Sequence, residues 1–481
     1  MSISSSLSNA LSGMTAASRM AEVVSSNVSN SLTDGYGRRS LNLSSSVVGG
    51  HGAGVEIGSI TRHVDRGVLG DRRLAGASLG GYSALVSTMN RIQDAIGEVG
   101  NSGSISNRIV AVETALIGAA SDPSSSINLS ALAEKLSDVA TSLNTASRDI
   151  QNERERADSS ISDQVSRLNT ALSQVQQFNK DITNANNSGY DPSGLMDQRQ
   201  LVIDGISEIV PVREIRRTGG QVALMTPSGE TLLDGEAKAF GFVQNPVITP
   251  DMTIQSGALS GITLDGQTIA TDGVGKLSGG TLGATFQARD SELITAQKGL
   301  DAIAADLIGR FQDPNVDPTL APGEAGLLTD AGAAYDVANI VGSSSRISLN
   351  MLVDPSEGGA LSKLRDGLNA TSIGPSGNAS LLQALSGALA DARTTATDPV
   401  QQSVAGRASS IEAEMGSKRV EFESEVSFAS ARWSSLKEAE TADGVDTDYE
   451  MQMLLRVEQA YAANARVIQT VETLMQRLME I

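Results

Sequence analysis

Four oxygen-bearing side chains between residues 313 and 324 have the spacing of a calcium-binding loop. They fall at positions 1, 3, 5 and 12 of the EF-hand pattern, in which carboxylate and amide oxygens coordinate Ca²⁺: Asp313, Asn315, Asp317 and Glu324. Pro318 stands where that pattern has a glycine, and proline cannot make the backbone turn required there. We therefore favour an acidic surface loop over a calcium site and expect no metal and no cofactor.

The rest of the chain offers little for catalysis. It contains no cysteine, so thiol chemistry, disulfides and Cys-ligated zinc are excluded. Serine is abundant, but only two histidines, His51 and His63, could act as a base, and they lack the spacing of a metal-binding pair. We expect both histidines to be exposed to solvent and the protein not to be an enzyme.

The length and charge of the chain limit its class and its partners. At 481 residues it exceeds one core, so roughly two to four domains are expected. The net charge of −20 repels nucleic acid and anionic membranes. No apolar run approaches the roughly 20 residues that span a bilayer, and residues 1–32 lack the basic and apolar regions of a signal peptide. We expect no nucleic-acid partner, no membrane insertion and no cleaved signal peptide.

Both ends of the chain are predicted to form long amphipathic helices. Apolar residues recur there with alternating spacings of four and three, which is the heptad seam of a coiled coil. A capping box at residues 447–450 is expected to begin the second helix. The seam of the first helix includes Ile3, Leu7, Met14, Val24 and Val28, and that of the second includes Leu454, Val457, Tyr461, Asn464, Val467, Ile468, Val471, Leu474 and Leu478.

These seams need partners. The simplest arrangement packs the terminal helices against each other and against neighbouring copies, with an ordinary intramolecular helix pair as the alternative. A stop segment rich in Asn and Gly follows the first helix and belongs to the same predicted assembly interface. Its members are Asn27, Asn30, Gly35 and Tyr36.

The interior predicts an α+β class: an elongated, multi-domain chain in which a long helical bundle, formed by the N- and C-terminal halves, carries a small β-rich domain in the middle. No Gly or Pro interrupts residues 124–188, and residues 293–311 and 401–439 are also helical in pattern. Strand–turn–strand patterns surround residues 227–229 and the Asp265-Gly266 dipeptide, which favours a type I′ turn. The mixed-charge run at 153–156 is expected to be a solvated helix face.

These patterns divide the chain into seven predicted segments. They are an N-terminal assembly helix with a connecting segment (1–65), the first part of a helical rod (66–210), a β-rich domain (211–284), a helix returning to the rod (285–311), a variable insertion or irregular connection (312–377), the second part of the rod (378–440) and a C-terminal assembly helix (441–481).

Three segments resemble a known superfamily. S-S-N-V-S-N at 25–30 with T-D-G-Y at 33–36 resembles the N-terminal signature of flagellar rod, hook and hook-associated proteins. The sequence Q-A-Y-A-A-N-A-R-V-I-Q-T at 459–470 resembles their C-terminal helix. L-M-D-Q-R-Q-L at 195–201, followed by a helix, a hairpin and F-Q-A-R-D at 286–290, is similar to the interior of the hook-associated protein 1 family.

The resemblance implies a non-enzymatic structural subunit at the junction between flagellar hook and filament. It implies export by the flagellar type III system without signal cleavage, and an extracellular location. The implied partners are other copies in a ring, the hook protein, the next junction protein, an export chaperone and the type III export apparatus. A polymerising hook or rod subunit is the alternative within the superfamily, and a calcium-dependent secreted protein or enzyme is the alternative outside it.

Overall fold

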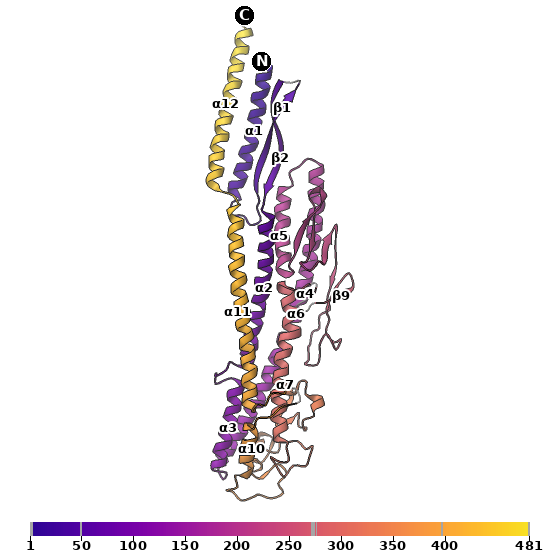
Figure 1. The fold of residues 1–481 in the computed structure, drawn as a ribbon, viewed down its shortest axis with the longest axis vertical. Helices are drawn as coiled ribbons and strands as arrows, with labels where there is room; N and C mark the ends of the chain where they lie inside the picture. The colour runs from indigo at the N-terminus through magenta and orange to yellow at the C-terminus, as the bar shows by residue number, and fades with distance from the viewer. Residues whose placement is uncertain (1–2, 49–50, 271–274, 276, 396–397, 480–481) are drawn as a thin grey trace. The chain divides into compact units, whose positions relative to one another are not determined.

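The computed structural model describes residues 3–48, 51–270, 275, 277–395 and 398–479, which fold into two compact units (Figure 1). Unit 1 is built from Met1–Leu79, Ser166–Ala239 and Phe428–Ile481, as far as these are described, and unit 2 from Gly80–Val165 and Phe240–Ser427. The chain passes between the units within three long helices and between residues 239 and 240. These helices are α2 (Arg66–Ile96), α4 (Ser126–Asn187) and α11 (Val404–Ala442).

In unit 1 the two terminal helices pack side by side and antiparallel, with both chain ends at the same end of the pair (Figure 1). They are α1 (Ile3–Ser29) and α12 (Thr447–Met479), so both predicted helices are confirmed. The predicted capping box is wrong by one residue. Asp446 accepts the N–H groups of Asp448 and Tyr449 at 2.9 and 3.1 Å. Because a carboxylate already caps these donors, Thr447 is the first helical residue and not the cap.

A long hairpin covers another side of α1, where the sequence predicted only a connecting segment. It consists of β1 (Arg38–Val48) and β2 (His51–His63), paired antiparallel with two register shifts. The hairpin approaches α1 closely at Gly54, whose φ is +95° and whose missing Cβ would lie 2.1 Å from Ser12 Oγ. That hydroxyl accepts the Val55 N–H at 3.1 Å. Only glycine satisfies both the backbone conformation and the contact at position 54.

The remainder of unit 1 joins helix α5 to a small sheet. Helix α5 (Ser193–Ile209) precedes a four-stranded antiparallel sheet with the order β3-β4-β5-β6. The predicted hairpin around residues 227–229 is confirmed as its central pair. The strands are β3 (Arg213–Arg216), β4 (Val222–Met225), β5 (Thr231–Asp234) and β6 (Glu236–Ala237), and a 3₁₀ turn, η1 (Thr218–Gly220), lies between β3 and β4.

Unit 2 contains a second sheet and a helical core. The second predicted hairpin is confirmed, because Asp265 and Gly266 have the positive φ values, 49° and 79°, of a type I′ turn. The sheet has the order β7-β8-β9, with strands β7 (Phe240–Gly241), β8 (Ile262–Leu264) and β9 (Gln267–Ile269). The principal helices besides the shared ones are α3 (Ile105–Ser121), α6 (Gly280–Gln287), α7 (Leu293–Phe311) and α10 (Ser380–Ala390). The two predicted β hairpins thus lie in different units.

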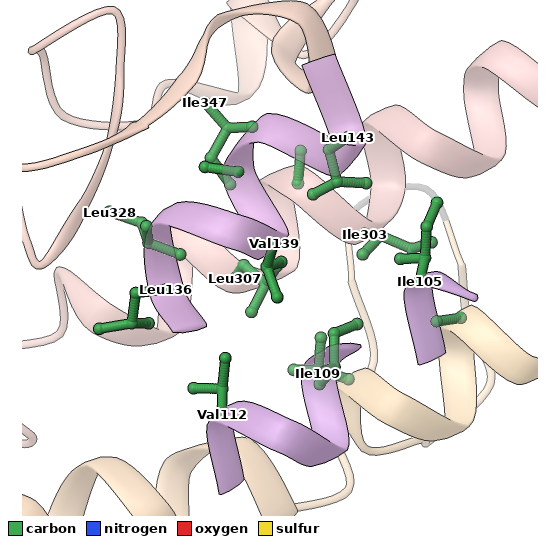
Figure 2. Close-up of a cluster of buried hydrophobic side chains, with 14 of the residues drawn as sticks. Ile105, Ile109, Val112, Leu136, Val139, Leu143, Ile303, Leu307, Leu328 and Ile347 are labelled. Carbon is green, nitrogen blue, oxygen red and sulfur yellow. The ribbon is translucent and has the colours of Figure 1, made fainter. Parts of the chain in front are cut away.

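The core of unit 2 brings residues 312–377 against the helices. Figure 2 shows Leu328 beside Leu136 and Ile347 near Leu143 of α4, in one cluster with side chains of α3 and α7. Each such buried aliphatic group stabilises the fold by about 1.5–3 kcal/mol. The segment also contains β10 (Leu328–Asp330), β11 (Ile347–Leu349), α8 (Ser343–Arg346), α9 (Lys363–Asp366), η3 (Val337–Asn339) and η4 (Pro355–Glu357).

A buried charge network links α4 to a π-helical turn, η2 (Ala288–Glu292), between α6 and α7. Arg289 donates to Asp158 at 2.5 Å, and both side chains are fully buried. Arg154 donates to the carbonyls of Thr249 and Met252 at 3.1 and 2.5 Å, and burial lowers its pKa to about 10. The expectation that residues 153–156 form a solvated face is therefore wrong at Arg154, because the segment around 245–252 covers this side of the helix.

Candidate assembly interface

The terminal helix pair of unit 1 leaves much of its predicted apolar seam uncovered. The buried members of the predicted set are Val24, Asn27, Val457 and Val471. The half-buried members are Ile3, Met14, Val28, Asn30, Gly35, Tyr36, Leu454, Asn464 and Ile468. The remaining five stay exposed: Leu7, Tyr461, Val467, Leu474 and Leu478. Leu474 and Leu478 are 47% and 59% exposed, although each is an apolar side chain on a regular helix.

Further apolar side chains extend this exposed surface beyond the predicted set. Leu11 of α1 and Leu455 of α12 are more than half exposed, and Met451, Met475 and Met479 are also exposed. Apart from Met475, which widens the predicted stripe of the second helix, sequence reasoning missed them because they lie off the four-three repeat. We call the exposed members of α1 and α12 the terminal apolar surface: Leu7, Leu11, Met451, Leu455, Tyr461, Val467, Leu474, Met475, Leu478 and Met479.

Asn464 of α12 lies close to Gly13 of α1. A Cβ on Gly13 would lie 2.7 Å from Asn464 Nδ2, so glycine at position 13 makes room for the amide. The same Nδ2 donates to the Ala460 carbonyl of its own helix at 3.0 Å. Gly13 was not among the predicted interface residues, and its place opposite Asn464 is visible only once the helices are paired.

The stop segment after α1 is held by one buried amide. Asn27 is 1% exposed, and its Oδ1 accepts the Tyr36 hydroxyl at 2.9 Å and the Arg39 N–H at 3.0 Å. Its Nδ2 donates to the Arg39 carbonyl at 2.9 Å. Asn27 thus pairs with Arg39 as a neighbouring strand would, which fixes the start of β1 against the end of α1. Burial also raises the pKa of the Tyr36 hydroxyl.

Asp197 of α5 receives the chain as it leaves this stop segment. Its carboxylate accepts the Gly37 N–H at 3.1 Å, an Arg39 N–H at 2.7 Å and the Arg62 Nε–H at 2.6 Å. Arg62 also donates to the Gly35 carbonyl at 3.1 Å. The N-terminal signature and the D-Q-R segment, which are about 160 residues apart in sequence, therefore meet in one ion-pair network, which we call the Asp197 network (Gly37, Arg39, Arg62 and Asp197).

The start of α12 is fastened next to this network. Arg38 Nε donates to Glu450 Oε1 at 2.8 Å, and Glu450 is 2% exposed. The hydrogen bond to Glu450 is the main reason that the pKa of Arg38 is raised. The Arg38 guanidinium also lies over the ring of Tyr449, 4.8 Å from its centroid. Residues flanking the Asp197 network thereby hold the end of α1 and the start of α12.

The calcium pattern does not form a site. The Asp317 carboxylate accepts the N–H groups of Thr319 and Leu368 at 3.0 Å each, and Glu324 accepts that of Ala321 at 2.8 Å. Asp313 accepts N–H groups of Asn315. Within the described ranges, no group of three His, Cys, Asp or Glu side chains could hold a metal ion. These carboxylates instead stabilise the turns around them, as an acidic loop would.

Other functional signals are equally weak. His63 is exposed and lies 2.7 Å from Ser40 Oγ, whereas the side chain of His51 is outside the described set. A G-x-S-x-G sequence at residues 76–80 was missed in the sequence, but it lies inside helix α2, where the Ser78 hydroxyl donates to the Leu74 carbonyl. A nucleophile elbow requires a strand-to-helix turn instead. Among the described helices, none combines the length and apolar character needed to cross a membrane.

Comparisons with known proteins agree on one family of similar proteins. Residues 89–324, just under half of the chain, match the model of the flagellar hook-associated protein FlgK helical domain. This range contains both the D-Q-R segment and the F-Q-A-R-D sequence of the π-helical turn. The interior of the chain is thus similar to the FlgK family. Members of this family are structural flagellar proteins and not enzymes, which agrees with the sequence prediction.

Curated relatives support the family at modest identity. Flagellar hook-associated protein 1 of Salmonella typhimurium is 25% identical over 242 residues, covering 48% of this chain and 43% of the relative. The Bacillus subtilis protein of the same name is 26% identical over 232 residues, covering 45% and 46%. The chain thus spans less than half of the length of these relatives. The solved flagellar hook junction protein FlgK from Burkholderia pseudomallei has 19% identity and a TM-score of 0.46, over 55% of this chain and 47% of that one.

Proposed function

We propose that this chain is a structural subunit of the junction between the flagellar hook and filament. The observation that carries the proposal is the terminal apolar surface on a helix pair that the Asp197 network and the Arg38–Glu450 pair anchor. Similarity to the FlgK family supports the flagellar setting. A surface of this kind on a family of structural proteins is suited to subunit packing, not to catalysis.

The partners follow from this role. Copies of the chain associate in a ring through their terminal helices, with hook protein on one side and the next junction protein on the other. The subunit reaches this extracellular position through the flagellar type III export apparatus, with an export chaperone and without a cleaved signal peptide. Described helix α1 carries one acidic and one basic side chain, Glu22 and Arg19, paired at 2.8 Å, so few charges oppose its burial between copies.

Folding of the terminal helices is coupled to this assembly. Burying one exposed Leu side chain, such as Leu474 or Leu478, contributes about 1.5–3 kcal/mol. A neighbouring subunit that covers the terminal apolar surface therefore stabilises the helix pair, which alone leaves these groups in water. Packing between copies then transmits torque from hook to filament.

Asn464 is proposed to set the register of the terminal helices. A polar residue on an apolar seam favours the one alignment in which its hydrogen bonds are satisfied. Asn464→Leu is expected to assemble with reduced fidelity, measured as the fraction of hooks that carry filaments. If Asn464→Leu assembles at the wild-type level, Asn464 does not set the register of the terminal helices.

Electron microscopy of cells lacking the gene, with an assay for flagellin in the medium, tests the proposed function. We expect complete hooks without filaments and flagellin shed into the medium. Missing hooks would instead indicate the alternative of a rod or hook subunit. Normal filaments would contradict a flagellar role altogether.

A further inference from the structure

A small cavity of about 30 Å³ in unit 1 has three arginines in its lining, together with apolar residues. It lies between the start of α2, helix α5 and strand β3, beside the Asp197 network. Its charged lining comprises three arginines and one carboxylate: Arg62, Arg66, Arg199 and Glu214. We call these residues and the cavity the arginine pocket. In a chain with 56 acidic and 36 basic side chains, such a concentration of guanidinium groups is unusual.

The carboxylates near the pocket are already engaged by other cations. Glu214 accepts an N–H of Arg73 at 3.0 Å, and Arg62 is paired with Asp197 at 2.6 Å. Arg66 and Arg199 form no ion pair with any carboxylate in the described parts of the chain. Arg66 and Arg199 therefore have no ion-pair partner of their own, and the one carboxylate in the lining, Glu214, is shared with Arg73.

Arg199 is held rigidly in this position. It is 7% exposed, and its Nη1 donates to Asn179 Oδ1 and to the Gly220 carbonyl, both at 2.8 Å. These neutral acceptors orient the guanidinium without cancelling its charge. Burial is the main reason that the pKa of Arg199 is lowered to about 10. The Glu214 carboxylate opposes this shift, and Arg62 and Arg66 add to it. The surroundings thus disfavour the charged form of Arg199, and an anion bound next to it would stabilise that form.

Arg66 forms the accessible side of the pocket. It is exposed, and it is the first residue of α2, where Asp65 caps the N–H groups of Gly67 and Val68 at 2.8 and 3.1 Å. The positive end of the helix dipole favours an anion at this place over the arginine that occupies it. The pKa of Arg66 is lowered, first by burial and then by Arg216. A carboxylate between Arg66 and Arg199 would contact both guanidinium groups.

We propose that the arginine pocket binds a carboxylate side chain of a second copy of the chain and forms a subunit contact in the assembly. The inference rests on the proposed function, which places copies side by side. Charge complementarity selects the occupant, since a surface with a net charge of −20 presents carboxylates to its neighbours. A cavity of about 30 Å³ is of the size of a small group such as a carboxylate.

The chemistry of the pocket is tested with acetate as the probe. The Nε–H resonances of arginine in the ¹⁵N-labelled full chain are followed while acetate replaces chloride at constant ionic strength. We expect the Arg199 resonance to shift saturably in the wild type, and Arg66→Gln to weaken acetate binding about tenfold because one charged donor is lost. Arg217→Gln is the matched control, because it removes an equal charge from an exposed arginine paired with Asp234 outside the pocket.

The occupant is tested by self-association of the same proteins in sedimentation velocity. We expect Arg66→Gln to weaken self-association about tenfold and Arg217→Gln to leave it unchanged. Acetate should weaken the wild type and have little effect on Arg66→Gln. Leu474→Ser is the reference for association through the terminal apolar surface.

Three results would overturn the inference. If the Arg199 resonance does not respond to acetate, the pocket does not bind a carboxylate. If Arg66→Gln self-associates as strongly as the wild type, a second copy does not occupy the pocket. The same conclusion follows if the wild type stays monomeric at every concentration. If Leu474→Ser weakens association while Arg66→Gln does not, the arginine pocket is refuted and the proposed function stands.

Discussion

Asp197 accepts three hydrogen bonds from groups that reach it from the stop segment and from β2. Two of the donors are guanidinium groups, those of Arg39 and Arg62, whose side chains are 17% and 12% exposed. Removing a carboxylate from such a site leaves cations without a partner in a place that water reaches poorly, which costs far more than losing a surface ion pair. The anchoring of β1 and of the end of α1 therefore depends on this single side chain.

Asp197→Asn is expected to lower the free energy of unfolding of unit 1 by about 2–3 kcal/mol, because the amide cannot neutralise Arg39 and Arg62. Urea denaturation followed by circular dichroism measures the change. Asp234→Asn is the control, since Asp234 pairs with Arg217 at the surface, where both side chains are 45% exposed. Equal denaturation midpoints for Asp197→Asn and the wild type would contradict the importance of the Asp197 network.

We predict that the stability of unit 2 depends on pH through the buried carboxyl group of Asp301. Burial raises the pKa of its carboxyl above the ordinary value of 3.8, although the carboxylate accepts N–H groups of Gly342, Ser344 and Gln297. The folded state therefore takes up a proton at higher pH than the unfolded state, so this group favours folding increasingly as pH falls toward 3.8. That contribution is lost as pH rises through the folded pKa.

The stability of the wild type relative to Asp301→Asn is expected to increase between pH 7 and about 4, because the variant lacks the titrating group. Denaturant midpoints of both proteins at several pH values measure this difference in stability, with Asp149→Asn as an exposed comparison. A difference that shrinks as pH falls would mean that the folded carboxyl has a lowered pKa.

Helix α12 has two parts with different surroundings. Between Glu450 and Val471 several of its side chains are buried or half-buried in unit 1, whereas every described residue from 472 to 479 is exposed. The last two turns thus contribute apolar surface to the terminal helix pair but little packing within the monomer. In α12, the part up to Val471 therefore packs within the subunit, and the exposed part from residue 472 to 479 is available to a neighbouring subunit.

Deletion of residues 474–481 is expected to abolish incorporation at the junction while changing the denaturation of the purified chain little. Incorporation is measured by immunoblot of isolated hook–filament structures and folding by circular dichroism. Deletion of Met1 and Ser2 alone serves as a length control at the opposite end. Normal incorporation of the shortened chain would refute assembly through the terminal helices.

Some elements were predictable from sequence and others were not, for physical reasons. Helices α1, α4, α7 and α12 follow from apolar periodicity, and the turn at Asp265-Gly266 follows from local backbone preference. The β1–β2 hairpin was missed because Ser and Gly dilute its alternation and its stability comes from contact with α1. The partners of Asp197 and Arg154 were not predictable, because each network joins segments far apart in the chain.

At the scale of the whole molecule, buried arginines organise both units. In unit 1, Arg73 bridges Asp204 and Glu214 at 2.6 and 3.0 Å. In unit 2, Arg310 and Arg407 share Asp306, at 2.8 and 3.3 Å. Such networks are costly to desolvate but restrict the chain to one arrangement, because any other leaves a buried charge unpaired. Each unit is thus internally fixed, whereas the terminal apolar surface is left for association.

The central claim is that the terminal apolar surface assembles the subunit into the junction. The most direct test is the fraction of hooks that carry filaments, counted by electron microscopy, in cells whose only copy is the double variant Val467→Ser and Leu474→Ser. Met351→Ser, an exposed apolar residue of unit 2, is the matched control. The account predicts bare hooks with the double variant, filaments with the control, and near-wild-type folding of both. Normal filaments with the double variant would contradict it.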